Sequence, residues 1–482
     1  MEQQAIKDQT IKNEANREIE SPQVLPAPAP KPAQIKKELR AYYHIKDEPK
    51  SDRVAMFLTS FAAVLKYTGY KGLLDAYARS SAKCARCANA CHLYQVTKDD
   101  RDIPCYRTNM LLDIYKRYFT YGGKLKATIL GDRGLTEDDI DDLKESLYRC
   151  TACRRCTLEC PLGIDHALMT HLGRYILGEM RIVPKALRVS VIEQLEGQTR
   201  NTSAIPKPAL IDTIEFLEGE LKDNTGQDIK FPLDVEGAEY LFVPAVSDFM
   251  MEADTLMGNA AVMHAAGYAK KWTIGTKNYD GINYGLFYSD WALDHIIRQL
   301  VAEAERLKVK KIMVGECGHA SRTAKQFVPV FGGALARPVV NCMEFAYEML
   351  KAGKLKLKKD AIEEKVTYHD PCNIARSGWI VDQPRYILKS FCKNYIEMSD
   401  GGRRNYCCGG GGGTVSIDEM HDFRMEVGGR VKAEQLKATG AQIVVAPCAN
   451  CKKQIRELID HYKLDMELVG LHDLLLKAIV WD

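Results

Sequence analysis

Two strings of cysteines constrain this chain more than any other feature. In the first, Cys150, Cys153, Cys156 and Cys160 follow one another at the spacing C-x-x-C-x-x-C-x-x-x-C, and Pro161 comes next. This spacing is typical of the ligands of a cubane [4Fe–4S] cluster, and in two-cluster proteins the fourth cysteine binds the other cube. A structural zinc site is the alternative, but zinc sites usually separate two cysteine pairs by a longer spacer.

An incomplete copy of the same motif lies upstream. Cys84, Cys87 and Cys91 are one cysteine short of the usual four, and His92 stands where the proline is expected. Cys105 follows after a short loop and restores the count to eight cysteines, enough for two cubes. The predicted ligands are Cys84, Cys87, Cys105 and Cys160 for one cube and Cys91, Cys150, Cys153 and Cys156 for the other. His92 is the alternative ligand to Cys105, but with a full set of thiolates we favour a hydrogen-bonding or packing role for it.

The second string spans the C-terminal third with the pattern Cys372-x34-Cys407-Cys408-Gly409-x38-Cys448-x-x-Cys451. Adjacent cysteines cannot easily cap one corner of a cube, but they can reach neighbouring irons of a more extended cluster. The run Gly409–Gly413 has no Cβ atoms, so we expect its backbone to come close to inorganic sulfide. A degenerate zinc site and a metal-free thiol pair are the alternatives, and each leaves at least one of these cysteines unexplained.

Composition divides the 482 residues into five predicted parts. A tail rich in proline and lysine is too polar to bury a core, and a helical region with both cubanes follows it. Next come a connector with several prolines, a degenerate α/β repeat and an intact α/β repeat. Their bounds are 1–49, 50–184, 185–236, 237–360 and 361–482. Helical apolar spacing is seen in Val54–Leu65, Met110–Tyr118 and Asp138–Tyr148.

The two α/β parts carry a weak internal repeat. The predicted strands are Tyr240–Val243, Lys311–Val314, Lys365–Tyr368 and Gln442–Val445, and strands separated by helices indicate parallel sheets. The stretch Lys311–Ala320 parallels Gln442–Cys451, although the alignment is short and chance similarity is the alternative. The predicted fold class is therefore α+β multidomain. A helical two-cluster ferredoxin-like domain precedes two pseudo-repeated α/β domains, of which only the second keeps its cysteines.

Cys317 is the one cysteine that the first repeat retains at a ligand position. By the repeat it should face the C-terminal cluster. We predict a catalytic role for it as a substrate-facing thiol, with His319 as the proton donor, and a buried structural cysteine is the equal alternative. Cys342 and Cys392 match no ligand position and are predicted to be core residues. For His369, a place beside the cluster and a satisfied turn histidine are both open.

Bulk properties exclude several functions. A net charge of +3 is too small to indicate a basic surface that binds nucleic acid. The chain has neither a GxGxxG fingerprint nor a P-loop, so we expect no bound flavin or nucleotide. The longest apolar run, Val54–Leu65, is too short to span a bilayer, and no signal peptide is visible. Sixteen cysteines without a secretion signal indicate metal thiolates in a reducing compartment, which predicts a cytoplasmic protein.

The order of parts resembles the CCG-bearing iron–sulfur subunit (HdrD) of membrane-linked heterodisulfide reductase over roughly residues 50–480. In that family the CCG motif binds a non-cubane [4Fe–4S] cluster with five cysteines. The resemblance implies the ligands Cys372, Cys407, Cys408, Cys448 and Cys451 here. Within the family, the altered first motif and the single intact CCG site look most like the catalytic subunit of the DsrMKJOP membrane complex of sulfate-reducing organisms.

The resemblance also implies a function and partners. A DsrM-like haem b quinol oxidoreductase subunit would supply electrons, which would pass through two cubanes to the non-cubane cluster. There a disulfide or trisulfide of a small DsrC-like protein would be reduced, or oxidised in the reverse direction. The missing ligands of the first repeat disfavour a small heterodisulfide as substrate. The protein would lie on the inner face of the cell membrane, attached through its partner subunits. The competing hypothesis is a non-catalytic relay subunit of the glycolate, lactate or glycerol-3-phosphate dehydrogenase type.

Overall fold

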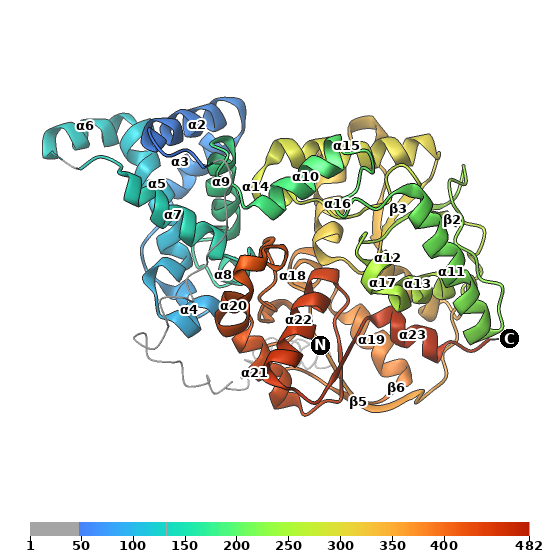
Figure 1. Cartoon of the computed structure of the whole chain (residues 1–482). Coiled ribbons are helices and arrows are strands. Elements are labelled where there is room, and N and C mark those ends of the chain that lie inside the picture. The colour runs from blue at the N-terminus through green and yellow to red at the C-terminus, as the bar shows by residue number, and fades with distance from the viewer. Residues whose placement is uncertain (1–47, 132, 482) are drawn as a thin grey trace, which may run out of the picture.

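The computed structural model describes residues 48–131 and 133–481, so the predicted tail lies almost entirely outside it. Figure 1 shows a helical lobe on one side and a larger α/β part on the other. The helices of the lobe are α2 (Arg53–Tyr67), α3 (Tyr70–Ser80), α4 (His92–Thr97), α5 (Pro104–Phe119), α6 (Tyr121–Leu130), α7 (Glu137–Arg149), α8 (Arg155–Leu158) and α9 (His166–Glu179). The three helices expected from apolar spacing correspond to α2, α5 and α7.

Local sequence explains why these helices form. Helix α7 opens with a capping box between Thr136 and Asp139, and its first turn is acidic, which suits the positive end of a helix dipole. Its buried residues include Ile140, Leu143 and Leu147, at helical spacing on the face toward the core. Short cysteine-bearing loops separate the helices, so the lobe is a scaffold for those loops.

The segment predicted as a connector is more regular than expected. It contains two helices, α10 (Lys185–Glu196) and α11 (Lys207–Thr225). Pro184 and Pro206 are the residues that cap these helices at their N-termini, so the prolines mark helix starts. In Figure 1 both helices run along the α/β part and help to cover it.

Two parallel four-stranded sheets form the α/β part. The first has the order β2-β1-β3-β4 and the second the order β6-β5-β7-β8, so both follow the same pattern of second, first, third and fourth strand. The strands are β1 (Tyr240–Val243), β2 (Trp272–Thr273), β3 (Lys311–Val314), β4 (Val339–Asn341), β5 (Ile362–Tyr368), β6 (Cys392–Ile396), β7 (Ile443–Val445) and β8 (Glu467–Val469). The predicted strands correspond to β1, β3, β5 and β7.

Helix packing repeats the same symmetry. The helices of the first repeat are α12 (Asp248–Met251), α13 (Ala253–Ala265), α14 (Gly285–Tyr288), α15 (Asp290–Arg306), α16 (Gly318–Phe331) and α17 (Cys342–Lys351). Those of the second are α18 (Cys372–Gly378), α19 (Asp382–Phe391), α20 (His421–Phe423), α21 (Arg430–Thr439), α22 (Ala449–Tyr462) and α23 (Leu471–Ala478). Helix α13 packs on α23, and its counterpart α19 packs on α17. The predicted pair of pseudo-repeated α/β domains is therefore confirmed.

The two repeats meet where β3 and β7 end. Cys317 and Cys448 make the same tight turn, each donating its backbone N–H to the carbonyl two residues earlier at 2.7 Å. A buried polar network joins the repeats at this point, because the Glu316 carboxylate accepts a hydrogen bond from His472 at 2.7 Å and lies 3.4 Å from the Lys452 ammonium. Such a network fixes the relative position of the two sheet edges.

Replacing Glu316 by glutamine tests this junction. Burial by itself raises the pKa of Glu316, but Lys452 and His472 lower it to about 2, below its usual 4.5. Because the pKa of Glu316 is lower in the folded than in the unfolded chain, its ionised carboxylate stabilises the fold above pH 4.5. This contribution to the free energy of unfolding is lost as the pH falls toward 2. We expect Glu316→Gln to lower the free energy of unfolding by about 3 kcal/mol at pH 7. Urea unfolding at several pH values should show the difference shrinking in acid, and a constant difference would contradict the network.

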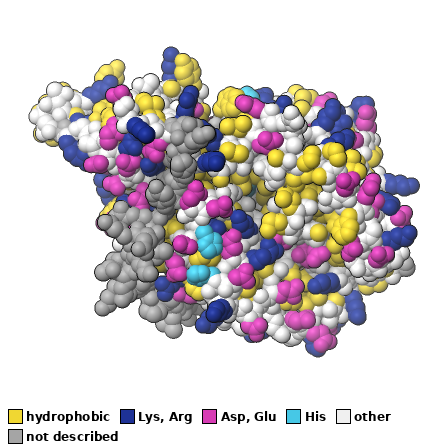
Figure 2. Space-filling model, viewed as in Figure 1, with side chains coloured by type: hydrophobic (Ala, Val, Ile, Leu, Met, Phe, Trp, Pro, Cys, Tyr) yellow, Lys and Arg dark blue, Asp and Glu magenta, His cyan; other side chains and the backbone are white. Residues whose placement is uncertain are grey.

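The surface adds two further observations. Within the described ranges, no helix combines the length and the apolarity that crossing a bilayer requires. Figure 2 shows lysine and arginine interspersed with aspartate and glutamate over the face in view, without a one-sign stripe. On that face the structure therefore adds no basic surface of the kind that nucleic acid binds.

Candidate metal centres

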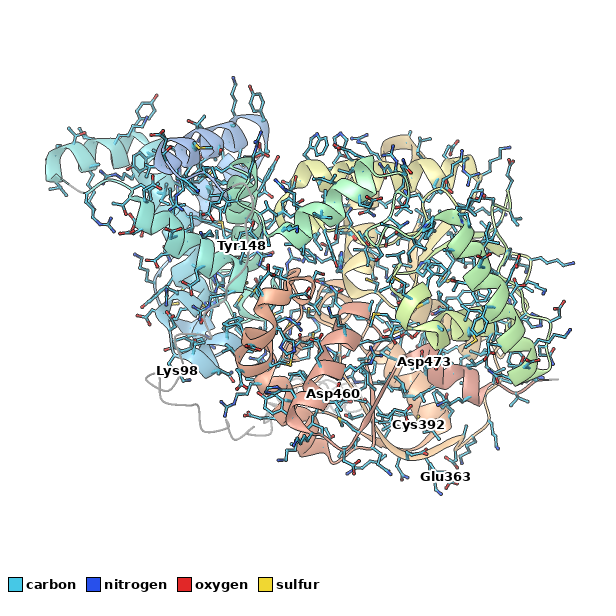
Figure 3. The ribbon with its side chains drawn as sticks, viewed as in Figure 1. Lys98, Tyr148, Glu363, Cys392, Asp460 and Asp473 are labelled. Carbon is cyan, nitrogen blue, oxygen red and sulfur yellow. The ribbon has the colours of Figure 1, made fainter. Side chains whose placement is uncertain are left out.

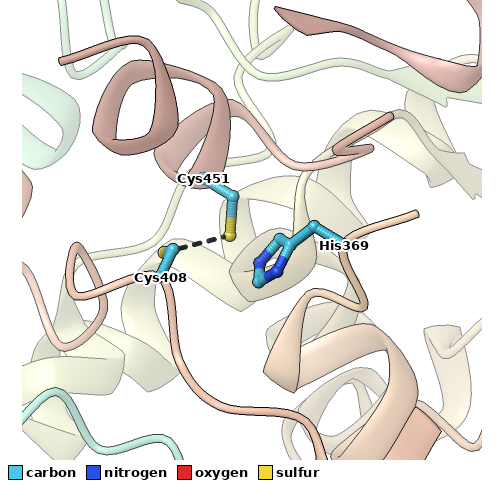
Figure 4. Close-up of side chains that lie close together, drawn as sticks. All are labelled: His369, Cys408 and Cys451. Atoms are coloured by element: carbon cyan, nitrogen blue, oxygen red, sulfur yellow. Dashed lines mark hydrogen bonds between the residues drawn. The ribbon is translucent and has the colours of Figure 1, made fainter. Parts of the chain in front are cut away.

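The five cysteines of the C-terminal string come together at one edge of the second sheet. Cys372 starts α18 just beyond β5, and Cys448 caps α22 just beyond the neighbouring strand β7. The carboxyl ends of parallel strands are where ligands bind in open α/β folds. Cys408 and Cys451 lie 3.4 Å apart between their sulfur atoms (Figure 4). Cys407 is in hydrogen-bonding contact with Cys372 and Cys408, and Cys451 with Cys448, so contacts connect all five thiols.

This arrangement fits an iron–sulfur group. All sixteen cysteines fall within the described residues and are free thiols, so none is used in a disulfide. His369 points toward Cys408 and Cys451 (Figure 4). Neither of its buried ring nitrogens has a nitrogen or oxygen partner, and the ring is in hydrogen-bonding contact with the Cys408 thiol. Buried polar atoms are normally hydrogen-bonded, and here the imidazole has sulfur instead of oxygen or nitrogen beside it, which fits a ring that lies against a sulfur-bound group. Of the two options for His369, the structure therefore favours the place beside the cluster over the satisfied turn histidine.

The ligands predicted for the second cube share one hollow in the helical lobe. Cys91, Cys150, Cys153 and Cys156 line it together with His92 and Arg107. His92 thus lies with this set, and its buried Nε2 atom has no protein partner. Cys105 lies elsewhere, with its backbone N–H 3.2 Å from the Cys87 sulfur. His92 is therefore placed to act on the second set, and the alternative that it replaces Cys105 in the first is not supported.

The first set is only partly assembled. Cys87 and Cys105 are buried in one small cluster, against which Cys156 packs. Cys84 is exposed and Cys160 partly exposed, and none of the contacts described for the chain joins either of them to Cys87. The assignment of Cys84 and Cys160 to this cube therefore remains a prediction from spacing.

The three cysteine sets form a continuous series. Cys156 belongs to the second set and packs against the small buried cluster that contains Cys87 and Cys105 of the first. On the other side, Cys153 packs against the five-cysteine site and is in hydrogen-bonding contact with Cys407. Each set therefore touches the next at one cysteine.

Glycines and arginines hold this junction together. A Cβ atom on Gly411 would lie 2.6 Å from the Thr151 carbonyl oxygen, and one on Gly412 would lie 2.8 Å from that of Cys150. Arg174 donates to the carbonyls of Gly412 and Cys150, both at 2.7 Å. The junction lies beside Tyr148, which is labelled in Figure 3.

The glycine run has a role in addition to the one predicted, and its predicted approach to inorganic sulfide stays a prediction. The positive φ angles expected for it occur at Gly409, Gly412 and Gly413, at 100°, 66° and 86°. The atoms that crowd its missing Cβ positions, however, belong to the protein, including the backbone of Gly428 and the side chain of Leu187. The run lets the C-terminal repeat dock on the loop formed by residues 150–154, which carries Cys150 and Cys153 and is called the cubane loop below.

Arg376 makes a second bridge that the motifs did not reveal. Its guanidinium donates to the Cys153 carbonyl at 2.5 Å and to the Arg403 carbonyl at 2.8 Å. It follows Cys372 by one helical turn in α18, so the spacing from a ligand is the one sequence signal that points to it. It ties the cubane loop to the five-cysteine site.

Cys317 lies where the repeat predicts, but in a closed environment. It is fully buried, burial raises its pKa well above the usual range, and the next residue, Gly318, donates its N–H to the Cys448 sulfur at 3.2 Å. His319 is buried too, its ring stacks on Tyr284, and burial lowers its pKa to about 4. A neutral, stacked imidazole fits packing better than proton donation. Cys342 and Cys392 are buried, as expected for core residues.

Comparison with known proteins agrees with this division of the chain. Residues 366–456 match the model of the cysteine-rich CCG domain, and residues 82–164 match the 4Fe-4S dicluster domain. Fold and site thus define an iron–sulfur protein in which a helical dicluster ferredoxin region precedes an α/β region with a CCG domain.

The chain is also similar to individual known proteins over most of its length. The chain is 29% identical to an Hdr-like menaquinol oxidoreductase iron-sulfur subunit 2 of Archaeoglobus fulgidus, over 83% of this chain and 79% of the relative. It is 29% identical to the corresponding iron-sulfur subunit of Archaeoglobus profundus, over 88% and 83%. The HdrD protein of the dihydromethanophenazine:CoB–CoM heterodisulfide reductase of Methanosarcina barkeri is 23% identical over 82% and 93%. No solved structure matches the chain significantly. The chain is thus similar over most of its length to iron–sulfur subunits of Hdr-like and heterodisulfide reductase complexes.

Proposed function

We propose that this chain is the iron–sulfur subunit of a quinol-linked membrane complex and that its five-cysteine site reduces, or in reverse oxidises, a disulfide or trisulfide. Within the family it would correspond to DsrK, also called HmeD. The observation that carries the proposal is the continuous series of cysteine sets, joined through Cys156 and Cys153. A redox chain needs such closely spaced centres, whereas a structural metal site does not.

The site residues take the following roles in this proposal. The first cubane is held by Cys84, Cys87, Cys105 and Cys160, the second by Cys91, Cys150, Cys153 and Cys156, and a non-cubane [4Fe–4S] cluster by Cys372, Cys407, Cys408, Cys448 and Cys451. When bound, these clusters supply one-electron redox chemistry. Four of the five cysteines of the C-terminal site are buried, which limits the access of water to it. Arg376 and the glycine run fix the distance between the cubane loop and this five-cysteine site, also called the CCG site here.

Substrate approach is proposed at Cys372. The other four cysteines of the site are at most 5% exposed, and Cys372 alone of the five is partly exposed. A cysteine-bearing tail of a small DsrC-like protein is narrow enough to reach such a restricted opening, whereas a folded surface is not. The electron donor would be a DsrM-like haem b subunit, which would also hold the chain at the inner face of the membrane.

The same burial favours a second candidate function. Because most of the site is closed, the chain would equally serve as a relay subunit that passes electrons to another protein without binding a sulfur substrate. The Hdr-like menaquinol oxidoreductase relatives are named for their quinol activity, and their names specify no sulfur substrate.

An anaerobic assay separates the two functions. The purified protein receives electrons from reduced viologen and is offered a peptide with a disulfide or trisulfide between two cysteines. Reduction of the disulfide takes two electrons and two protons and releases two thiols, which are counted with a thiol reagent. Thiol release by the wild type but not by Cys408→Ser supports the proposal, and viologen oxidation only by quinone analogues supports a relay.

The catalytic role of Cys317 is tested in the same assay. If the Cys317 thiol faces the substrate, turnover depends on its sulfur atom, which serine lacks. We therefore expect Cys317→Ser to lower the rate of thiol release at least tenfold. Cys342→Ser is the matched control, since Cys342 is also a buried cysteine outside the ligand sets. An unchanged rate for Cys317→Ser would assign the residue, and His319 with it, to packing.

A further inference from the structure

Lys432 is a buried lysine without a conventional partner. It lies in α21, is 1% exposed, and the one hydrogen bond of its ammonium goes to the Met398 sulfur at 3.1 Å. A thioether is a weak acceptor. Lysine is almost never fully buried unless it is paired, because an unpaired buried charge is costly. Some other group must therefore make this position tolerable.

The five-cysteine site is the negative group that Lys432 faces. Met398, whose sulfur the ammonium meets, packs in one buried cluster with Cys407, Cys408, Cys448 and Cys451. Burial lowers the pKa of Lys432 to about 8, and the charges that oppose this are Asp370 followed by Cys408, Cys407 and Cys451. Asp370 is already neutralised, because both its oxygens pair with Arg385 at 2.8–2.9 Å. The cysteine thiols are then the remaining negative groups that act on the Lys432 charge.

Lys452 shows how the same fold treats a lysine that is buried for structural reasons. It is also fully buried, but it lies 3.4 Å from Glu316 and 3.7 Å from Glu252. The chain thus supplies carboxylates where the charge only joins two repeats. Near Lys432 the described part of the chain supplies no carboxylate other than Asp370, which is already paired with Arg385.

His369 adds an independent observation at the same place. Its ring nitrogens have no oxygen or nitrogen partner and lie beside Cys408 and Cys451, the ring is in hydrogen-bonding contact with the Cys408 thiol, and the charge of Lys432 acts on it. Two buried nitrogen-bearing side chains from different elements therefore lie near the cysteines, and the partners described for both are sulfur atoms. Both side chains are explained if they donate hydrogen bonds to a sulfur-rich group that the cysteines hold.

We propose that Lys432 is a positioning residue for the CCG site, where its ammonium donates a hydrogen bond and a positive charge to the sulfur atoms that the five cysteines hold. This inference rests on the proposed function only in requiring that these cysteines bind an iron–sulfur group. Hydrogen bonds and net charge near the sulfurs set the reduction potential of such groups. Lys432 raises the potential of the CCG site, which favours electron flow toward it from the cubane loop.

The test is a redox titration of the holoprotein followed by electron paramagnetic resonance. Lys432→Met removes the charge and keeps an apolar chain of similar length beside Met398. Lys437→Met removes the same charge from an exposed position of the same helix and is the matched control. At a fixed solution potential we expect Lys432→Met to raise the ratio of oxidised to reduced CCG signal at least about tenfold, which is ~59 mV for a one-electron couple. Lys437→Met should leave it unchanged.

Two outcomes overturn the inference, one supports it, and a fourth bears on the proposed function instead. A potential unchanged in Lys432→Met, with full iron content, shows that Lys432 only packs. An equal shift in Lys437→Met shows a general effect of surface charge. Lys432→Arg keeps the charge, and a potential nearer to wild type than that of Lys432→Met supports the inference. A wild type whose CCG site holds no iron refutes the proposed function itself.

Discussion

Cys407→Ser is expected to empty the five-cysteine site while leaving both cubane sets loaded. Cys407 touches more of the other thiols than any ligand in the site, since it contacts Cys153, Cys372 and Cys408. A serine hydroxyl is a poor substitute for a thiolate toward iron. Chemical analysis should therefore find iron falling from about twelve to about eight atoms per chain, with thiol release from the disulfide peptide reduced to background.

Cys392→Ser provides the control for this loss. Cys392 is buried at the start of β6, lies in the α/β part (Figure 3), and belongs to no ligand set. It should keep its full iron content. Equal loss in both variants would point to misfolding, and zinc in place of iron in the wild type would contradict the cluster assignment.

Gly412→Ala is expected to break the docking of the C-terminal repeat on the cubane loop. Its φ of 66° is unfavourable for alanine, and the new Cβ would lie 2.8 Å from the Cys150 carbonyl oxygen, which is backbone and cannot easily move. We expect a loss of about 2–4 kcal/mol in unfolding free energy. The reduced cubanes should also transfer electrons to the CCG site more slowly in rapid-freeze experiments.

Gly219→Ala is the matched control for Gly412→Ala. Gly219 lies in helix α11, where a Cβ would meet open space, so alanine should be neutral or slightly stabilising. Thermal unfolding of the two variants separates a local clash from a general effect of removing glycine. Equal stability of Gly412→Ala and the wild type would contradict the assigned role of the glycine run.

The sequence predicted the central strands and missed the edge strands, for a physical reason. The central strands β1 and β7 are fully buried and read as apolar runs. The missed strands β2, β4, β6 and β8 all lie at sheet edges. Strand β6 carries exposed polar residues and β2 has only two residues, so neither leaves a pattern that stands out from a loop.

The site was predictable to the extent that local spacing defines it. Cysteine spacing predicted the five-cysteine site, whose thiols the structure connects. It did not predict which side chains surround the cysteines, because those come from distant segments. His92 belongs beside Cys153, and the glycine run meets the cubane loop, which only tertiary packing decides. Lys432 and Arg376 carry no motif at all, although both border the site.

Electron paramagnetic resonance of the anaerobically purified, oxidised protein, before and after addition of a thiol peptide, separates a catalytic CCG cluster from a relay. Oxidised cubanes of this type are silent, so the cubane sets contribute no background. A catalytic cluster predicts a paramagnetic signal that shifts or broadens with the thiol and is absent from Cys407→Ser. Signals that appear only on reduction and ignore the thiol would contradict the catalytic cluster and leave a relay subunit.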